Sequence, residues 1–344
     1  MSRWKPFREL SVCRFREFSR EPEVIFWVFV FPLLLAVGLG VAFRDRPAEK
    51  TLVAVIDQSD AATLAEHLNR AGNIQAEVLK PAQAHHALRL GKVAIVVVPG
   101  NPVQYQFDRT RPDSLLARSM VDSALQRAAG RQDPLATADQ FVTEPGARYI
   151  DFLIPGLLGM NLMGGGMWGV GYVIVDMRIK KLLKRMMATP MRRSDFMLAM
   201  IFSRLVFMVA EVFILLVFGR LVFGMIIRGS ISSIVVVGFL GSMCFAGMGL
   251  LVASRAQKIE TVSGLMNLVM LPMYVLSGVF FSAERFPKTF QPVIQSLPLT
   301  ALNDAFRSVI LEGASLASQT GELVIMTAWG VVSFLLALRW FRWN

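Results

Sequence analysis

The chain has few of the residue types that most often carry catalysis, metal binding or covalent cross-links. Its 344 residues include two cysteines and three histidines. Cys13 lies in a basic N-terminal segment and Cys244 lies inside a long apolar run, so we expect no disulfide between them. The histidines are His67, His85 and His86, and adjacent histidines on a helix point about 100° apart. These residues predict neither a metal site nor another cofactor site in this chain.

A phosphate-binding P-loop is also missing from the sequence. The position five residues before Gly91-Lys92 holds His86 and not the glycine that the loop requires. The run Gly164–Gly166 lies within an apolar segment, where glycines allow helices to pack closely or to flex. We therefore expect no hydrolytic activity in the chain itself. Any energy that it uses must come from an ion gradient or from a partner ATPase.

Long apolar runs dominate what is present, and 54% of the residues are hydrophobic. Six runs of 18 to 24 residues are each long enough to cross the roughly 30 Å of bilayer hydrocarbon as a helix. They are Val24–Phe43, Phe152–Val175, Phe196–Phe218, Ile231–Ala253, Val262–Phe281 and Leu323–Trp340. These runs predict an α-helical polytopic membrane protein with six transmembrane helices. The first run, 24–43, is too long for a removable signal peptide and lacks a small-residue cleavage site.

Residues 44–148, between the first and second runs, have the alternating pattern of a small α/β domain. We predict strands at Thr51–Ile56, Gln75–Leu79, Val93–Val98 and Val103–Phe107, and helices at Ala61–Ala71, Pro81–Leu90 and Leu115–Ala129. The remaining region, 149–344, holds the other five apolar runs. The insert contains no recognisable catalytic constellation.

The distribution of basic residues predicts which side of the membrane each segment occupies. Residues 1–23 contain six basic residues and residues 176–194 contain seven, whereas residues 44–148 contain 13 basic and 12 acidic residues. By the positive-inside rule, both termini and the 176–194 loop are cytoplasmic and the 44–148 domain is extracytoplasmic. The net charge of +11 follows the membrane edges instead of forming one groove-sized face, so nucleic acid is not an expected partner.

Two of the cytoplasmic segments have amphipathic patterns. Residues 1–23 are predicted to form an interfacial helix on the inner membrane face. The loop 176–194 is predicted to contain a short basic helix that either transmits a push from a docked subunit or lies on anionic lipid. The candidate coupling residues lie on one face of that helix or in the turn that ends it: Ile179, Leu182, Leu183, Met186, Thr189 and Pro190.

Four polar residues within the apolar runs are candidates for a substrate pathway: Asn161, Arg204, Glu211 and Asn267. Arg204 and Glu211 are seven residues, and so roughly 10 Å, apart on nearly the same helix face. Ionisable groups in hydrocarbon are costly and usually face the interior of a bundle. The pair either binds a polar part of a substrate or relays a conformational change. Alternatively, it belongs to an interhelical polar network in which Arg204 snorkels toward the cytoplasm.

The segment 286–311 is interrupted by three prolines and is too broken to cross the membrane. We predict broken helices in the outer leaflet that form a lid over an exit. The lid candidates are Pro298, Thr300, Asp304 and Arg307. We expect Asp304 and Arg307 to pair with each other, because residues at i and i+3 are neighbours on a helix surface.

Four stretches of the chain resemble type 2 ABC transporter permeases, the membrane subunits of ATP-driven exporters of drugs, lipids and polysaccharides. The stretches are Arg16–Pro32, Tyr149–Gly156, Leu183–Pro190 and Leu297–Arg307, and their order spans essentially the whole chain. One departure is Ile179–Leu182, where the family often has an acidic stretch containing Gly-Thr.

The resemblance implies a non-catalytic permease of the bacterial inner membrane, surrounded by membrane lipids. It would work with a cytoplasmic ABC ATPase that binds ATP and Mg, and with a second permease chain that is identical or a close paralogue. The implied substrate is amphiphilic, drug-like or lipid-linked, and it moves outward. Two alternatives remain open, a gradient-driven secondary transporter and a non-transporting sensor or scaffold. Glu211 is the one deep carboxylate and no internal repeat is visible, which disfavours the secondary transporter.

Overall fold

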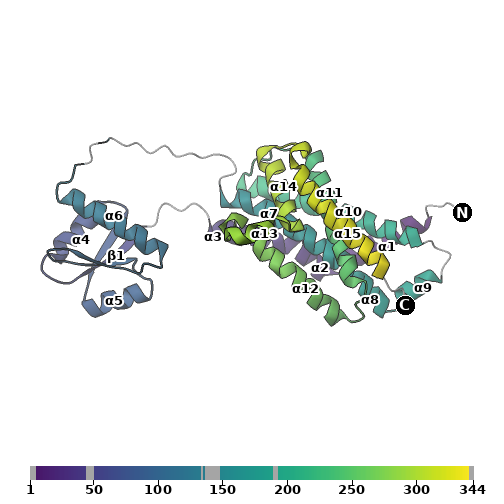
Figure 1. The fold of residues 1–344 in the computed structure, drawn as a ribbon, viewed down its shortest axis with the longest axis horizontal. Coiled ribbons are helices and arrows are strands. Elements are labelled where there is room, and N and C mark those ends of the chain that lie inside the picture. The colour runs from purple at the N-terminus through teal and green to yellow at the C-terminus, as the bar shows by residue number, and fades with distance from the viewer. Residues whose placement is uncertain (1–4, 44–49, 133–134, 136–147, 189–192, 341–344) are drawn as a thin grey trace. The chain divides into compact units, whose positions relative to one another are not determined.

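A computed structural model describes residues 5–43, 50–132, 135, 148–188 and 193–340. The chain divides into two compact units (Figure 1). One unit consists of Met1–Arg44 together with Val142–Asn344, and the other is Asp45–Phe141. We call them the helical unit and the inserted unit, and each is described separately below.

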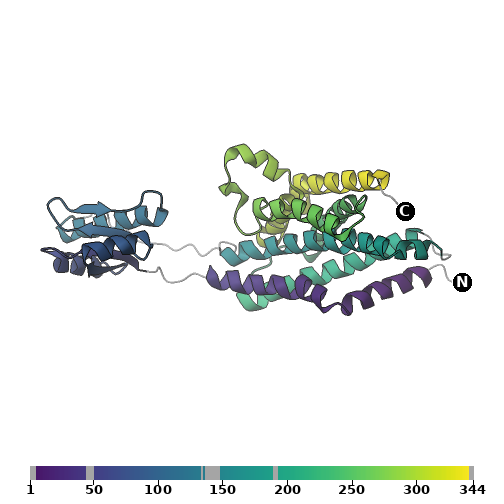
Figure 2. The same cartoon turned by 90° about the horizontal axis from the view of Figure 1, so that it is seen from below.

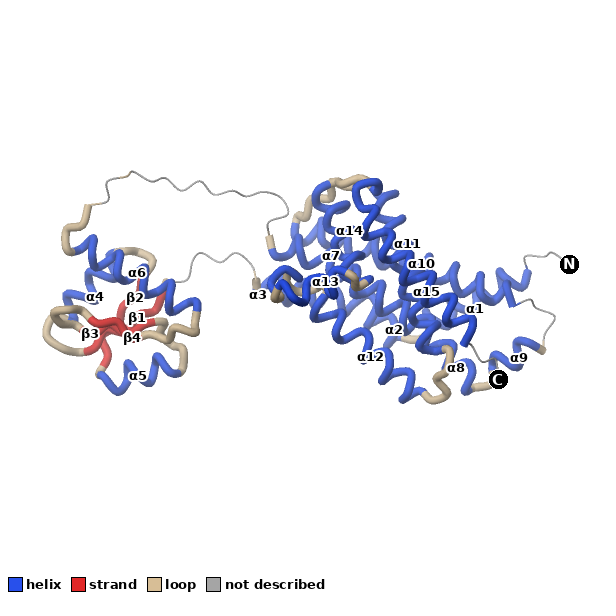
Figure 3. Tube along the Cα trace, viewed as in Figure 1, coloured by secondary structure: helices blue, strands red, loops and turns tan. Residues whose placement is uncertain are grey.

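The inserted unit contains a four-stranded sheet in the order β2-β1-β3-β4 (Figure 3). The strands are β1 (Thr51–Ile56), β2 (Ile74–Leu79), β3 (Ile95–Val98) and β4 (Gln104–Gln106). The strand β1 pairs in parallel with β2 and β3, and β4 is antiparallel to β3. The helices are α4 (Ala61–Arg70), α5 (Pro81–Arg89) and α6 (Pro112–Ala128).

Alternation along β1 explains how helices cover both faces of this sheet. Val53 and Val55 are buried with residues of α4 and α6, whereas Ala54 and Ile56 are buried on the opposite face with Ala84 of α5. Because both faces are covered, β1 is a continuous apolar run.

The strands and helices predicted for the insert are present. The strand β3 starts two residues later than expected, and α6 starts three residues earlier.

The helical unit has six helices that are long and apolar enough to cross a membrane, among the residues that the structure describes. Their bounds are Pro22–Ala42, Tyr149–Ile179, Leu198–Phe223, Ile231–Ala253, Ile259–Leu276 and Leu316–Trp340. This confirms the six predicted spans. The fifth span, predicted to run to Phe281, ends at Leu276 because Gly278 (φ 70°) turns the chain away from the helix. Figure 2 shows the long helices lying side by side.

Several of these spans combine more than one helical element. The first contains α2 (Pro22–Ile25), η1 (Phe26–Val30) and α3 (Phe31–Ala42), and the second contains α7 (Tyr149–Gly166), η2 (Met167–Tyr172) and α8 (Val173–Ile179). The remaining long helices are α10 (Arg193–Phe223), α11 (Ile231–Ala253), α12 (Ile259–Leu276) and α15 (Thr320–Trp340). The elements η1 and η2 are π-helical, a form often found at functional sites.

Glycines bring the helices around α11 into backbone contact. A Cβ added to Gly249 of α11 would lie 2.8 Å from the carbonyl oxygen of Gly166, and one added to Gly247 would lie 2.9 Å from that of Gly330 in α15. Real Cβ atoms do not approach so closely, so these positions require glycine. Such close approach is how membrane helices gain packing energy without a hydrophobic driving force between them.

The N-terminal helix α1 (Lys5–Ser19) packs against α10. Phe7 meets Phe202 with ring centroids 5.6 Å apart, and Phe18 stacks on Phe207 at 4.1 Å. Part of the apolar face of α1 is therefore covered by protein, which its amphipathic pattern alone does not specify.

The segment after α12 is broken into short elements, as predicted for residues 286–311. These are η3 (Ala283–Arg285), η4 (Lys288–Phe290), α13 (Gln291–Gln295), α14 (Pro298–Arg307), η5 (Ser308–Glu312) and η6 (Leu316–Gln319). The short helix α9 (Leu182–Met187) lies between the second and third spans.

Candidate functional site

The helical unit contains a cavity of about 1010 Å³ between α1, the first span, α7–η2, α10 and α12. All four pathway candidates line it: Asn161, Arg204, Glu211 and Asn267. Eight aromatic side chains also line it: Phe18, Trp27, Phe31, Trp168, Tyr172, Phe207, Tyr274 and Phe280. The cavity thus combines an aromatic wall with a few polar groups, which is the usual character of a small-molecule site.

A buried ion pair lies in the wall of this cavity. The Arg204 Nη1 and Nη2 atoms donate to Glu211 Oε1 and Oε2 at 2.6 and 3.2 Å, and the two side chains are 7% and 1% exposed. Both residues are on α10, so the long arginine side chain spans two helical turns along it. Two parallel hydrogen bonds between ionised groups form the strong, bidentate type of contact.

The direction of the Arg204 side chain corrects one of our expectations. It extends toward Glu211 and away from the N-terminal end of α10, whereas snorkelling toward the 176–194 loop would have turned it the other way. Arg204 Nη2 also donates to the carbonyl oxygen of Leu162 in α7 at 3.3 Å. An interhelical polar contact is therefore present. The Glu211 carboxylate is buried next to the Arg204 guanidinium and compensates its charge there. Arg204 therefore has a counter-ion without extending to the membrane surface.

The glycine run of α7 makes room for this arginine. A Cβ on Gly165 would overlap the Arg204 guanidinium, whereas a Cβ on the next residue, Gly166, would press on Phe245 of α11. Gly165 therefore leaves space for the Arg204 side chain, and Gly166 allows α11 to pack closely against α7. This gives the Gly164–Gly166 run two separate packing roles.

The two asparagines of the cavity differ in their surroundings. Asn161 is 9% exposed, and its Nδ2 donates to the carbonyl oxygen of Val28 in η1 at 2.9 Å, which ties α7 to the first span. Asn267 on α12 is exposed and has no hydrogen bond to another described residue. Asn267 is thus available to a bound molecule, whereas Asn161 already has a structural contact.

The spacing of the candidate coupling residues predicted one continuous helix. In the structure this helix is broken in two. The helix α8 ends at Ile179, and Lys181 adopts φ 58° before α9 begins at Leu182. The apolar periodicity could not reveal this break, because the periodicity continues through Lys181. A left-handed lysine costs roughly 1–2 kcal/mol.

The structure gives different detail for the individual coupling residues. Ile179 is 42% exposed, whereas Leu182 is half-buried and packs in one cluster with Leu10 of α1. Leu183 and Met186 belong to α9, and their side chains lie outside the described part of the chain. Thr189 and Pro190 are outside the described residues altogether.

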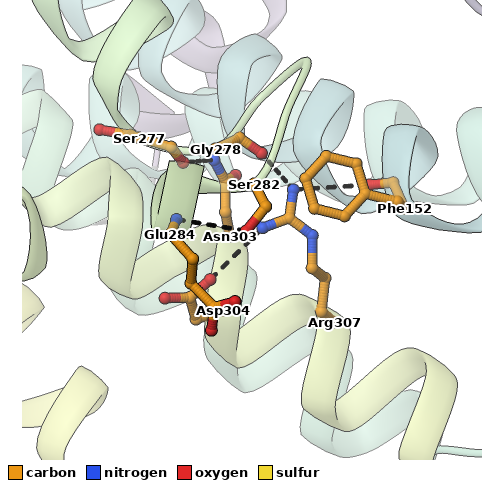
Figure 4. Close-up of polar contacts among 8 residues, drawn as sticks. All are labelled: Phe152, Ser277, Gly278, Ser282, Glu284, Asn303, Asp304 and Arg307. Carbon is orange, nitrogen blue, oxygen red and sulfur yellow. Dashed lines mark hydrogen bonds and ion pairs between the residues drawn. The ribbon is translucent and has the colours of Figure 1, made fainter. Parts of the chain in front are cut away.

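Two of the lid candidates, Asp304 and Arg307, belong to a separate polar cluster (Figure 4). Arg307 pairs with Asp304 at 3.3 Å, as expected for this i, i+3 spacing. Its Nη2 also donates to the carbonyl oxygens of Gly278 and Phe152, and its guanidinium lies 3.7 Å from the centroid of the Phe152 ring. Burial lowers the pKa of Arg307 to about 10, and Asp304 opposes that shift.

Arg307 therefore joins α14 to the start of α7 and to the turn after α12. Pro298 and Thr300 are buried in α14, and none of the four lid candidates lines the cavity. The sequence analysis missed Asn303, whose Nδ2 donates to the carbonyl oxygen of Ser277 at 2.8 Å. A polar residue on the buried face of an otherwise apolar helical stripe is the signal that could have identified it.

The inserted unit shows no comparable site in its described part. No group of three or more His, Cys, Asp or Glu side chains among the described residues is placed to hold a metal ion. The ring Nε2 of His85 lies 2.7 Å from Gln106 Oε1. Burial and a hydrogen bond to Asp122 raise the pKa of Tyr105 to about 12.

Comparisons with known proteins match this arrangement to membrane transporters. The family model described as "ABC-2 family transporter protein" matches residues 22–339. The chain is 21% identical over 337 residues to a probable multidrug ABC transporter permease, YbhS, of Escherichia coli K12, covering 90% of this chain and 89% of that one. It is 20% identical over 371 residues to the linearmycin resistance permease protein LnrN of Bacillus subtilis 168, covering 94% and 96%.

A third relative matches a smaller part of a longer protein. ABC transporter G family member 20 of Dictyostelium discoideum is 26% identical over 228 residues. That alignment covers 65% of this chain, but only 30% of the length of the Dictyostelium protein.

Proposed function

The chain belongs to the ABC-2 family of transporter proteins, and from this premise we propose that it exports an amphiphilic, drug-like or lipid-linked substrate with energy from a separate ATPase subunit. Membership of this family makes it a multi-pass membrane subunit of an ABC transporter. Such permease subunits are generally non-catalytic. The direction of transport, the substrate and the ATPase are the proposed parts.

The aromatic cavity with its buried ion pair is the observation that carries the proposal. Eight aromatic side chains offer a large apolar surface, and the pair Arg204–Glu211 offers a cation and an anion at one point of the wall. Ionisable groups within membrane spans are costly to bury, and in this wall they offer a polar group of a substrate contacts that an aromatic surface cannot. An amphiphile fits both features. The words "multidrug" and "linearmycin resistance" in the relatives' names agree with this substrate class.

We assign the coupling role to the segment around α8 and α9. Ile179 is exposed and is the last residue both of α8 and of the second candidate span, so it is free to contact a docked subunit. A push there would be passed along α8 and η2 to the cavity wall at Trp168 and Tyr172. In this account ATP and Mg are bound by the partner ATPase, and both termini and this segment are cytoplasmic.

We further propose that two permease chains, identical or closely related, work together in a bacterial inner membrane. Exposed apolar side chains such as Leu34 of α3 and Leu268 and Leu271 of α12 (55%, 69% and 58% exposed) require cover by lipid or by a second chain. The inserted unit would then be extracytoplasmic. The cluster around Arg307 would close the outer end of the path until the substrate leaves.

A co-purification experiment tests this proposal. The full chain is purified from its native membrane in mild detergent, and ATP hydrolysis is measured in the eluate. We expect an ATPase to co-elute in roughly equal amount, and we expect the substitution Ile179→Glu to reduce its retention. Leu135→Glu introduces the same charge at an exposed leucine of the inserted unit and is the matched control. A chain that elutes alone and moves substrate under an ion gradient would refute the proposal.

A further inference from the structure

A second hollow in the helical unit lies between α1 and the ends of α8, α9 and α10. It has a volume of about 700 Å³, which is within the range of ligand pockets. It adjoins the larger cavity, because Arg14, Glu17 and Met200 line both. We call it the α1 groove.

The floor of the α1 groove is apolar and lies at the depth where membrane spans begin. Leu10 and Val12 of α1 face Met177 of α8, Leu182 of α9 and Met200 of α10 across it. Met177 belongs to the last turn of the second candidate span and Met200 to the first turn of the third. The groove therefore lies at the boundary between the hydrocarbon and the aqueous phase, where lipid headgroups are found.

Three arginines at the rim have no ion-pair or hydrogen-bond partner in the part of the chain that the structure describes. Arg16 of α1, Arg20 in the turn after α1 and Arg185 of α9 are exposed, and their side chains make no ion pair or hydrogen bond among the described residues. The two carboxylates of the lining are already paired, since Glu17 binds Arg14 at 2.7 Å and Glu9 binds Arg8 at 2.9 Å. Three positive charges without a counter-ion among the described residues, from α1, the turn after it and α9, thus surround an apolar floor.

We propose that the α1 groove binds one acidic phospholipid of the inner leaflet. Its phosphate would lie between Arg16, Arg20 and Arg185, because the planar guanidinium group matches the geometry of a phosphate. Its acyl chain would cover the apolar floor. The bound lipid links α1 to α9, so the acidic lipid content of the membrane controls how firmly the coupling segment is held. A docked protein fits this groove less well, because the floor lies at membrane depth.

Lipid binding to the full chain, purified with whatever subunits it retains, tests the proposal. Native mass spectrometry measures its affinity for phosphatidylglycerol and for phosphatidylcholine. We expect Arg16→Gln, Arg20→Gln and Arg185→Gln to weaken phosphatidylglycerol binding by about fivefold each, and phosphatidylcholine binding by much less. The groove triple variant, which combines Arg16→Gln, Arg20→Gln and Arg185→Gln, is compared with a control triple variant, Arg255→Gln, Lys258→Gln and Arg339→Gln, which removes the same charge at residues that do not line the groove.

A second variant tests the apolar part without changing any charge. Val12 lines the groove and is 37% exposed, so Val12→Trp can fill the groove without disturbing a packed core. We expect it to weaken phosphatidylglycerol binding as well. Size-exclusion chromatography checks that each variant remains folded.

Three results would overturn this proposal. Equal losses in the groove and control triple variants would mean a general attraction of anionic lipid to the basic surface. Competition by millimolar inorganic phosphate that removes all binding would mean a site for free phosphate. Unchanged lipid binding together with loss of the ATPase subunit in the groove variants would assign the arginines to a protein partner.

Discussion

The ion pair between Arg204 and Glu211 allows a quantitative test that separates folding from transport. The change Glu211→Gln keeps the shape of the side chain and removes its charge, which leaves the Arg204 guanidinium buried without a counter-ion. Breaking a buried pair from one side typically costs 3–5 kcal/mol. The adjoining cavity of about 1010 Å³ admits water to the exposed charge, so we expect the lower end, about 3 kcal/mol.

The double variant Arg204→Gln with Glu211→Gln completes the cycle. It removes the attraction between the charges together with the cost of burying them, so we expect its stability to return to within about 1 kcal/mol of the native protein. Transport should not return with it, because a charged contact to a substrate is worth about 1.5–3 kcal/mol, or roughly tenfold or more in rate. Thermal unfolding in detergent measures the stability, and substrate-stimulated ATP hydrolysis by the purified complex measures the coupling.

Two outcomes would refute this reasoning. Single variants as stable as the native protein would show that the pair is not electrostatically coupled at its observed distance. A double variant that transports at the native rate would show that the pair only holds α10 and α7 together.

Two further predictions concern packing and ionisation. Gly249→Ala places a Cβ 2.8 Å from the carbonyl oxygen of Gly166 and should lower the thermal stability. Gly264→Ala is the control, because nothing lies within 4 Å of its added Cβ, and it should leave the stability unchanged. Equal effects of the two changes would refute the backbone contact. The pKa of Tyr105 is raised from 10 to about 12, so its stabilising contribution should be complete below pH 10 and lost between pH 10 and 12. Ultraviolet titration of the four tyrosines, compared with Tyr105→Phe, measures this, and a step centred at pH 10 would contradict it.

The element pattern was largely predictable because it follows from local periodicity. The span Ile231–Ala253 agrees with its apolar run at both ends, and Ser230 caps it by accepting a hydrogen bond from the Ser233 amide at 3.2 Å. The strand Thr51–Ile56 is equally well defined by its run of buried residues. In both cases a local pattern determines the boundary: the apolar run with its cap for the helix, and the run of buried residues for the strand.

Tertiary choices were not predictable from the same patterns. The periodicity of residues 176–187 continues through Lys181, where the helix breaks. The sequence spacing placed Arg204 and Glu211 on one face, but the direction of the arginine depends on which side offers a buried carboxylate. Asn303 interrupts an apolar helical stripe, but its partner, the Ser277 carbonyl, becomes its neighbour only in the folded chain.

One transport measurement tests the central claim most directly. Inverted membrane vesicles containing the chain and its ATPase are mixed with a fluorescent amphiphile in the medium. Accumulation of the amphiphile inside the vesicles is followed after addition of ATP. We predict accumulation that requires ATP, persists when a protonophore collapses the proton gradient, and falls strongly with Asn267→Trp, which fills the cavity from an exposed position. Accumulation that follows the ion gradient without ATP, or that is unchanged in Asn267→Trp, would contradict ATP-driven export through this cavity.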